Sequence, residues 1–379
     1  MAFKPQPVVD NNGRRYESIN DAARTLHISK SRIINGFKAQ GFYKSHRVDI
    51  RLYYEEDERA KLDCNTKELP PEVKYDPIEI EEFIKYKNVG ELPFTQYDFR
   101  VSEVETGSRY AVALFSDAHI EETVVPTAVL GLNEYNIDIA KKRIECYFNH
   151  LVQCIKEDGV SDLIFASLGD TISGYIHDEL SQTNGLSPLE ATFEAQNLIY
   201  NGLRVLCENT DLHSIKFIGI CGNHSRTTKK IQHSNGYRLS YEWLMYKNIE
   251  AYCQAKGMPI EFCIPESELA IVNAPDGRRF LFMHGFQIKS SGNATVCGIF
   301  PALMRLTMKY DRTFHQDRVF LGHFHSCISI PNAMVNGSII GYSAYSLSNG
   351  FNYEEPAQMY QLYDTKIGEM LTRKIYCSD

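Results

Sequence analysis

Residues 110–119 read YAVALFSDAH, an almost unbroken apolar run that ends in Asp117 and His119. A run of this composition is typical of a β-strand that is buried on both faces. Residues 162–170 repeat the pattern, since the apolar segment DLIFAS is followed shortly by Asp170. In parallel sheets, ligand-binding side chains collect beyond the carboxyl ends of the strands. The two stretches therefore predict a parallel sheet with a polar site at one edge.

The chain between these stretches and residue 364 alternates helical and strand patterns. Apolar periodicity predicts helices over residues 138–155, 188–207 and 236–254, further strands over residues 215–221, 279–283 and 318–321, and a β-rich region over residues 338–364. Alternation of this kind predicts a layered α/β fold. No segment is apolar over the length that a membrane span needs, so we expect no membrane insertion.

Three more polar motifs follow predicted strands. Asn223 and His224 follow the third strand, His284 the fourth, and His323 and His325 the last. A single histidine after a strand is more often an ordinary hydrogen-bonded loop residue than a ligand. Five motifs in succession, each at a strand end, instead predict a metal site.

The residue types in these motifs indicate the metal and the chemistry. Carboxylate, imidazole and amide oxygen together suit Mn²⁺, Fe²⁺ or Zn²⁺ better than the all-oxygen sites of Ca²⁺ and Mg²⁺. Two divalent cations about 3.5–4 Å apart neutralise a phosphoester and lower the pKa of a bridging water. We therefore expect two divalent ions, with Mn²⁺ preferred, and hydrolysis of phosphoester bonds.

The order D-x-H, G-D, G-N-H, H, G-H-x-H resembles that of the calcineurin-like metallophosphoesterases, over roughly residues 110–330. The resemblance implies an α/β fold with a layered β-sandwich flanked by helices, and a dinuclear site. It implies that Asp117, His119, Asp170 and His325 hold one metal, and that Asp170, Asn223, His284 and His323 hold the other. Asp170 would bridge the two ions, and His224 would act on the reacting phosphate as a catalytic residue rather than as a ligand.

The sequence departs from the family pattern directly after His224. Many family members have a carboxylate there, which would orient the imidazole, whereas this chain has Ser225. Which group takes over that orientation is left open by the sequence. Arg226, Lys229 and Lys230 follow, and they are candidates for holding substrate phosphates; the alternative is a solvated basic loop.

The charge of the chain is unevenly distributed. The formal net charge is −8, yet residues 1–52 carry ten Lys and Arg against four Asp and Glu. Residues 53–100 reverse this balance with seven against thirteen, and they contain several prolines. We therefore expect a basic module at residues 1–52, an acidic linker at 53–105 and the phosphoesterase domain at 106–379. A basic module on an acidic enzyme suggests a polyanionic partner.

The basic module has the pattern of two short helices joined by a turn. Ser18 is placed to cap the first helix, and Ser29 to cap a second that continues towards Gly41. Residues 16–33 resemble the small all-α helix-turn-helix modules attached to homing endonucleases and phage proteins. DNA contacts are then expected from Lys30, Ser31 and Arg32, at the leading end of the second helix. The alternative is a helical hairpin that packs on the enzyme or mediates a homo-oligomer.

Three classes of function remain open at this stage. The first is a DNA nuclease, favoured by the basic module and by similarity of the body to the double-strand-break-repair exonuclease branch and its phage relatives. The second is a phosphatase or cyclic-nucleotide phosphodiesterase, because fold alone does not determine substrate. The third is a DNA-binding protein with an inert body, which the complete ligand set disfavours. Ten scattered cysteines without a CxxC pair and the absence of a signal-like N-terminus lead us to expect a cytoplasmic protein.

Overall fold

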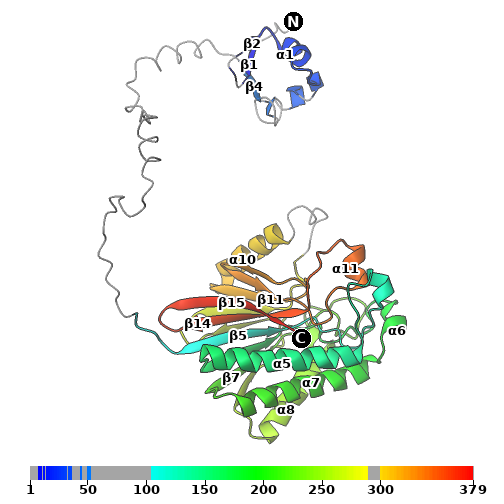
Figure 1. Cartoon of the computed structure of the whole chain (residues 1–379), viewed down its shortest axis with the longest axis vertical. Helices are drawn as coiled ribbons and strands as arrows, with labels where there is room; N and C mark the ends of the chain where they lie inside the picture. The colour runs from blue at the N-terminus through cyan, green and yellow to red at the C-terminus, as the bar shows by residue number, and fades with distance from the viewer. Residues whose placement is uncertain are drawn as a thin grey trace, which may run out of the picture. The chain divides into compact units, whose positions relative to one another are not determined.

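The structure is a computed structural model that describes residues 7–10, 12, 14–31, 33–35, 43–44, 49–52, 104–288 and 299–378 (Figure 1). The chain divides into two units, Met1–Arg100 and Val101–Asp379. Among the described residues, no helix combines the length and the apolar character that crossing a bilayer requires.

A six-stranded mixed sheet forms the centre of the C-terminal unit. Its order is β15-β14-β5-β6-β7-β8. The strands are β5 (Arg109–Phe115), β6 (Asp162–Ser167), β7 (Ser214–Gly219), β8 (Ile260–Cys263), β14 (Ala357–Asp364) and β15 (Gly368–Tyr376). Strands β5 to β8 are parallel, and β14 pairs with β5 in the antiparallel sense. The carboxyl ends of β5, β6 and β7 therefore meet at one edge, as the sequence predicted.

Three long helices cover one face of this sheet (Figure 1). They are α5 (Ile137–Asp158), α7 (Pro188–Asn209) and α8 (Tyr241–Ala255). Helix α7 begins with a reciprocal capping box between Ser187 and Glu190, which satisfies two backbone donors of its first turn. The predicted helices are thus confirmed, with ends that differ by a few residues. Their buried faces share one apolar core with the sheet.

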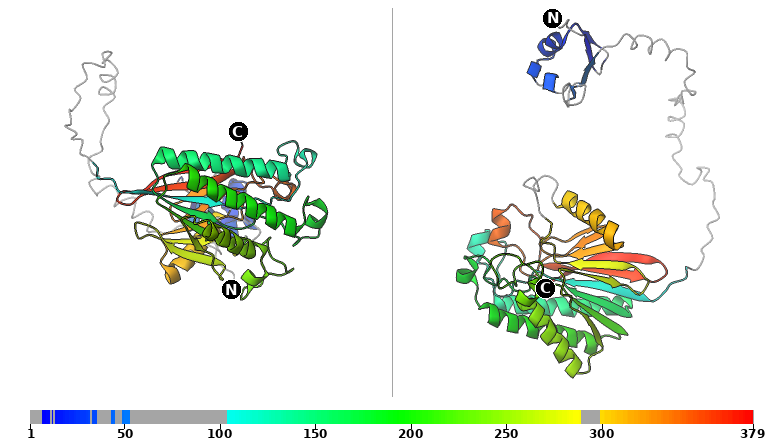
Figure 2. Two further views of the ribbon diagram at one scale, coloured as in Figure 1. Left: turned by 90° about the horizontal axis from the view of Figure 1, so that it is seen from below. Right: turned by 180° about the vertical axis from the view of Figure 1, so that it is seen from behind.

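A second, five-stranded sheet packs against the other face. Its order is β12-β13-β11-β10-β9. The strands are β9 (Leu269–Asn273), β10 (Arg279–Met283), β11 (Arg318–Leu321), β12 (Ile328–Ile330) and β13 (Ala333–Val335). Helix α10 (Phe300–Phe314) packs on its outer face (Figure 2). Strands β10 and β11 are parallel, so their carboxyl ends also share one edge.

Aromatic side chains fill the space between the two sheets. Tyr110 of β5 stacks on Tyr363 of β14 with ring centroids 4.9 Å apart, and it contacts Phe280 of β10 at 6.5 Å. Phe282 and Phe320 of the second sheet belong to the same buried cluster. The unit therefore has helix, sheet, sheet and helix layers, which agrees with the predicted α/β sandwich flanked by helices.

The segment at residues 338–342 corrects a sequence-based expectation. It was expected to be part of a β-rich region, but it forms no strand. The N–H groups of Ile339 and Ile340 donate to the carbonyl oxygen of Asp117 instead of to a neighbouring strand. Ile339, Ile340 and Tyr342 are buried in the apolar core that the helices share with the six-stranded sheet. Strands β8, β9, β12, β13 and β15, helix α10 and the short helices η2 (Pro126–Val129), α6 (Leu180–Thr183) and α11 (Ala344–Ser348) were not specified from the sequence; the start of the helix predicted over residues 236–254 forms the separate short helix η3 (Gly236–Leu239).

The N-terminal unit also corrects an expectation, because it is not all-α. It contains a sheet of order β2-β1-β4-β3, built from β1 (Val8–Asp10), β2 (Arg15–Tyr16), β3 (Tyr43–Lys44) and β4 (Asp49–Leu52). Strands this short carry too few residues for periodicity to reveal them.

The predicted first helix of this unit is confirmed as α1 (Ile19–Thr25). The Ser18 side chain accepts a hydrogen bond from the Asp21 N–H, as an N-cap should. Residues 30, 31 and 33–35 are helical as well. Lys30 and Ser31 therefore lie at the start of that second segment and are exposed, whereas Arg32, Gly41 and the proposed linker core lie outside the described residues.

The packing of α7 against α5 yields a prediction about stability. A Cβ added to Gly202 of α7 would lie 2.1 Å from the Phe148 ring of α5. Replacing glycine by alanine in a helix normally gains about 1 kcal/mol. Here overpacking costs about 1–3 kcal/mol, so we expect Gly202→Ala to lower the free energy of unfolding. Urea titration measures this, with the exposed Asn201→Ala as the control; a more stable Gly202→Ala protein would contradict the packing.

Candidate metal centre

The structure brings the predicted motifs together at the carboxyl ends of five strands. Asp117 and His119 follow β5, Asp170 follows β6, Asn223 and His224 follow β7, His284 follows β10, and His323 and His325 follow β11. Backbone hydrogen bonds join the loops within each sheet, such as Asp117 N–H to the Gly169 carbonyl at 3.0 Å. The His323 N–H donates to the Asp117 carboxylate at 3.0 Å and so joins the two sheets.

Asp117, His119 and His325 form a first candidate metal-binding group. One ligand atom from each residue lies within 4.8 Å of the others. The Nε2 atom of His325 is 3.4 Å from Asp117 Oδ1. Asp117 and His119 are buried, whereas His325 is partly exposed.

Asp170, His284 and His323 form a second candidate group. The Nε2 atom of His284 lies 2.8 Å from Asp170 Oδ2 and 3.2 Å from His323 Nδ1. Asn223 belongs with this group by position, since its Oδ1 is 3.1 Å from His284 Nε2. The seven predicted ligands therefore lie in one region; which of them bind which metal, and the bridging role of Asp170, stay predictions.

Hydrogen bonds on the far side of two imidazoles show that these groups fit metal ions. His119 Nδ1 lies 2.7 Å from Ser173 Oγ, and His284 Nδ1 lies 2.6 Å from the Leu168 carbonyl oxygen. Protons on these Nδ1 atoms leave the Nε2 atoms, which are directed into the groups, as the positions that can bind a metal. The Nε2 atom of His119 is buried and has no hydrogen-bond partner among the described residues. A buried acceptor without a partner is costly, and a cation would satisfy it.

The backbone of the site is conformationally restricted. Five of the predicted ligands, Asp117, His119, Asp170, His323 and His325, have φ between 46° and 73°. Non-glycine residues rarely adopt this left-handed region, and such residues concentrate at functional sites. The conformation turns each side chain back towards the common centre immediately after its strand.

Two glycines allow the loops to approach the carboxylates. A Cβ on Gly222 would lie 2.1 Å from Asp170 Oδ1, and a Cβ on Gly322 would lie 2.5 Å from Asp117 Oδ2. Neither loop could carry a side chain at these positions without moving away from the site. The G-N-H and G-H-x-H motifs therefore require glycine because the backbone of each loop lies very close to a carboxylate.

Imidazoles stabilise the two buried carboxylates. Burial raises the pKa of Asp170, but the charges of His284 and His224 outweigh it and hold that pKa well below its usual range. Conversely, burial lowers the pKa of His284, while the charge and hydrogen bond of Asp170 raise it to about 9. Burial and the charge of His284 lower the pKa of His323 to about 4, so His323 is neutral, the form that binds metals.

A buried polar network supports Asp117 from behind. Ser116 Oγ donates to Asp117 Oδ2, and Asn336 Nδ2 donates to Ser116 Oγ at 2.8 Å. Gln358 Oε1 accepts from the Ser116 N–H and from Asn336 Nδ2, both at 2.7 Å. Asn336 and Gln358 were not predicted from the sequence, because they lie far along the chain and outside any motif.

Glu242 is another site residue that was not predicted from the sequence. Its carboxylate accepts the Thr171 N–H at 2.6 Å and the Gly222 N–H at 2.7 Å. It thereby ties the loop that carries Asp170 to the loop that carries Asn223. Glu242 is fully buried in the first turn of α8, and burial together with the charge of Asp170 raises its pKa to about 7. An acidic residue in a first helical turn is common, so its sequence position gave no signal.

His224 lies beside both groups but is held differently from the ligands. Its backbone N–H donates to Asp170 Oδ1 at 2.8 Å. The Nδ1 atom of its ring lies 3.1 Å from the carbonyl oxygen of Ser173. Its ring contacts the rings of His119 and His177, with centroids 4.8 Å and 5.8 Å apart. Ser225 does not orient the imidazole, because its hydroxyl pairs with Ser240 Oγ at 2.8 Å.

The basic residues after His224 have different environments. The Arg226 guanidinium donates to the carbonyl oxygens of Asn223, Thr228 and Lys229, so it braces its own loop. Lys229 and Lys230 are exposed. Substrate binding by Arg226 would therefore use its remaining N–H donors, and phosphate binding by Arg226, Lys229 and Lys230 stays a prediction.

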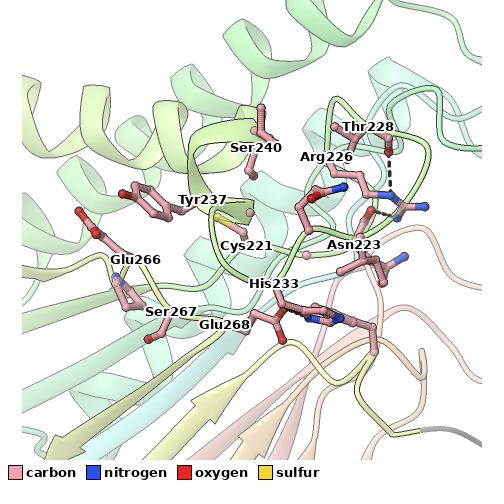
Figure 3. A pocket seen from close by; sticks show the side chains of 17 residues that line it. Cys221, Asn223, Arg226, Thr228, His233, Tyr237, Ser240, Glu266, Ser267 and Glu268 are labelled. Carbon is pink, nitrogen blue, oxygen red and sulfur yellow. Dashed lines mark hydrogen bonds and ion pairs between the residues drawn. The ribbon is translucent and has the colours of Figure 1, made fainter.

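Two pockets adjoin the site, one at each candidate group. The first is lined by Asn223 and Arg226 at one end and by Tyr237 and Glu266 at the other (Figure 3). His233 and Glu268 are paired in its wall, with Nδ1 and Oε1 2.6 Å apart. The second pocket is lined by His325, Gly341, Tyr342, Ser346, Phe351, Asn352 and Glu354.

Comparison with known proteins gives similarity to solved structures only. No family model and no curated protein matches the chain. A 5'-nucleotidase from Candida albicans is 11% identical with a TM-score of 0.33, over 73% of this chain and 53% of its own. A single-mutant Vps29 from Entamoeba histolytica is 12% identical with a TM-score of 0.30, over 70% of this chain and 97% of its own. A predicted phosphoesterase from Streptococcus pneumoniae is 10% identical with a TM-score of 0.26, over 70% of this chain and 97% of its own. Similarities this distant carry no conclusion about reaction or substrate.

The position of Asp170 yields a prediction about metal content. We expect Asp170→Asn to lose both metal ions or nearly so, because a carboxylate that bridges two ions cannot be replaced by an amide. Dialysis against Mn²⁺ followed by elemental analysis measures the metal per chain. Asp178→Asn, an exposed acidic residue eight positions further along, is the matched control. Equal metal content in wild type and Asp170→Asn would contradict the assignment.

Proposed function

We propose that this protein is a two-metal phosphoesterase. The observation that carries the proposal is the pair of adjacent aspartate and histidine groups, Asp117, His119 and His325 beside Asp170, His284 and His323. Two divalent ions held there, with Mn²⁺ preferred for this mixed donor set, would neutralise an anionic phosphate and lower the pKa of a water molecule.

His224 is the proposed acid–base residue. Its Nδ1 is engaged by the Ser173 carbonyl oxygen, so Nε2 is the atom available to a substrate. Its ring lies against the ring of His119 in the first group, and its backbone N–H donates to Asp170 in the second group. From this position an imidazolium that keeps its Nδ1 proton on the carbonyl oxygen would give its Nε2 proton to the leaving oxygen of the ester and become the neutral Nδ1–H form.

We propose a phosphodiester as the substrate. The pocket that includes Asn223 provides space for one organic substituent of the ester. The space that includes His325 is far smaller. The choice of a diester over a monoester therefore follows from the DNA partner proposed below.

We further propose DNA as the physiological diester. The support is the basic balance of residues 1–52, in which Lys30 and Ser31 are exposed at the start of a helical segment. A tethered module that binds the DNA backbone would raise the local concentration of substrate at the catalytic unit.

A phosphatase or cyclic-nucleotide phosphodiesterase is the second candidate. The pocket beside Asn223 carries the carboxylates of Glu266 and Glu268. Like charge there disfavours additional phosphates, which favours a small substrate over a polynucleotide at that pocket.

A substrate panel tests the phosphoesterase proposal. With Mn²⁺, we expect faster hydrolysis of bis-p-nitrophenyl phosphate than of p-nitrophenyl phosphate, and no hydrolysis with a chelator. His224→Ala should keep its metal while losing about 10²-fold or more in turnover, the usual scale for a general acid. His213→Ala, which removes an exposed imidazole just before β7, is the control. Loss of metal from His224→Ala would instead make His224 a ligand.

Deletion of residues 1–52 tests the DNA proposal. We expect weaker binding to long duplex DNA and a flatter salt dependence, by about 0.9 in the log–log slope for each phosphate that the protein no longer neutralises. Hydrolysis of the small diester should survive, because all proposed ligands lie between Asp117 and His325. Replacing Lys30 and Arg32 by alanine should reproduce part of the effect. Equal affinity and equal slope for full-length and truncated proteins would favour the small-substrate candidate.

A further inference from the structure

The orientation of His224 depends on a backbone carbonyl group instead of a side-chain carboxylate. In the metallophosphoesterases that this sequence resembles, a carboxylate often follows the equivalent histidine. Here the following residue is Ser225, and its hydroxyl is directed to Ser240. The group that meets His224 Nδ1 is the carbonyl oxygen of Ser173, at 3.1 Å.

That carbonyl belongs to a peptide unit whose other end is held by Glu121. The N–H of Gly174, which shares the peptide bond with the Ser173 carbonyl, donates to Glu121 Oε1 at 2.8 Å. The N–H of Ser173 donates to the same oxygen, also at 2.8 Å. In a trans peptide the N–H and C=O point in opposite directions. The hydrogen bonds therefore run in series from the Glu121 carboxylate, through one peptide group, to the His224 imidazole.

The surroundings of Glu121 hold this series in place. The side chain is 1% exposed, and its own carbonyl oxygen accepts the Gly185 N–H at 2.7 Å. Gly174 has φ of +57°, and a Cβ there would lie 2.6 Å from the carbonyl oxygen of His224. The peptide unit is thus pressed against His224 with no room for a side chain between them.

We propose that Glu121 is a positioning residue that orients His224 through the Ser173–Gly174 peptide. The inference rests on the proposed function in that it takes His224 as the acid–base residue. An acceptor on the N–H of a peptide polarises its carbonyl oxygen, because hydrogen bonds in a chain strengthen one another. The Ser173 carbonyl then fixes the proton of His224 on Nδ1 and leaves Nε2 directed at the substrate.

The decisive variants differ in the acceptor at position 121. Glu121→Gln keeps an oxygen in the same place, whereas Glu121→Met keeps the length and removes the acceptor. For Glu121→Met we expect turnover of the small diester to fall about 10- to 100-fold, the usual effect of removing a supporting hydrogen bond. Its KM and metal content should stay near those of wild type, and Glu121→Gln should restore turnover to within about threefold.

A second readout does not depend on activity. Histidine-labelled protein, studied by ¹⁵N NMR without metal, reports which ring nitrogen of His224 carries the proton. We expect the Nδ1–H form in wild type and in Glu121→Gln, and a mixture of the two tautomers in Glu121→Met. If Glu121→Met does not fold, Glu121→Asp, which withdraws the acceptor by one methylene, should show the same change.

Ser173→Ala separates the two hydrogen bonds that this loop makes to histidines. It removes the hydroxyl that supports His119 Nδ1 but keeps the carbonyl that supports His224. We expect this variant to bind metal more weakly while keeping the Nδ1–H form of His224. Reduced metal content with an unchanged His224 tautomer in Glu121→Met would show that Glu121 serves the His119 side, and it would overturn the proposal.

The remaining outcomes distinguish this inference from the proposed function. Unchanged turnover and an unchanged tautomer in Glu121→Met, in a protein that hydrolyses diesters, would overturn the inference and leave the function standing. A tautomer shift in a protein that hydrolyses no phosphoester would overturn the function and leave the positioning role standing. Failure of Glu121→Gln to restore the wild-type tautomer would also overturn the inference. An acceptor oxygen at position 121 would then not be what orients His224.

Discussion

The burial of two carboxylates, Asp117 and Asp170, is the constraint on which the rest of this structure depends. Both are almost fully removed from water, at 0% and 1% exposure. An unpaired charge in that position would cost several kcal/mol, so the surroundings must supply positive charge and hydrogen-bond donors. The structure supplies backbone N–H groups from His224 and His323, together with several imidazoles. Imidazoles can supply charge only when protonated, and divalent cations would satisfy carboxylates and neutral imidazoles together.

This requirement explains why the site needs both sheets. The six-stranded sheet contributes the two aspartates, and the five-stranded sheet contributes His284, His323 and His325. Neither sheet alone holds a complete candidate group. The aromatic core between the sheets, including Tyr110 and Phe280, therefore sets the distances within the site. Metal binding to ligands from both layers would in turn stabilise their packing, because binding energy of this kind is coupled to folding.

The parts of the structure that could be predicted from the sequence are those with a local signal. Continuous apolar runs marked β5 and β6, and polar motifs at the ends of strands marked the residues of the two candidate groups. Helix α10 was missed although its sequence is amphipathic, whereas the strands of the N-terminal unit have only two to four residues, too few for an alternating pattern to show. Glu121 and Glu242 were missed for another reason. Their role is to accept N–H groups from loops about 20 to 70 residues away, a relation that exists only in three dimensions.

Glu121 and Glu242 also explain how so many of the predicted ligands persist in an unfavourable backbone conformation. Asp117, His119 and Asp170 have left-handed φ, which the chain would leave if it were free to relax. Glu242 joins the backbone after Asp170 to that before Asn223, and Glu121 joins the backbone after His119 to the Ser173–Gly174 turn. Each carboxylate binds N–H groups of the main chain, so each fixes backbone direction. The environment of His224 then follows the same rule: Ser225 turns away to Ser240, and the acidic side chain of Glu121 reaches the imidazole through a peptide group that the fold already holds in place.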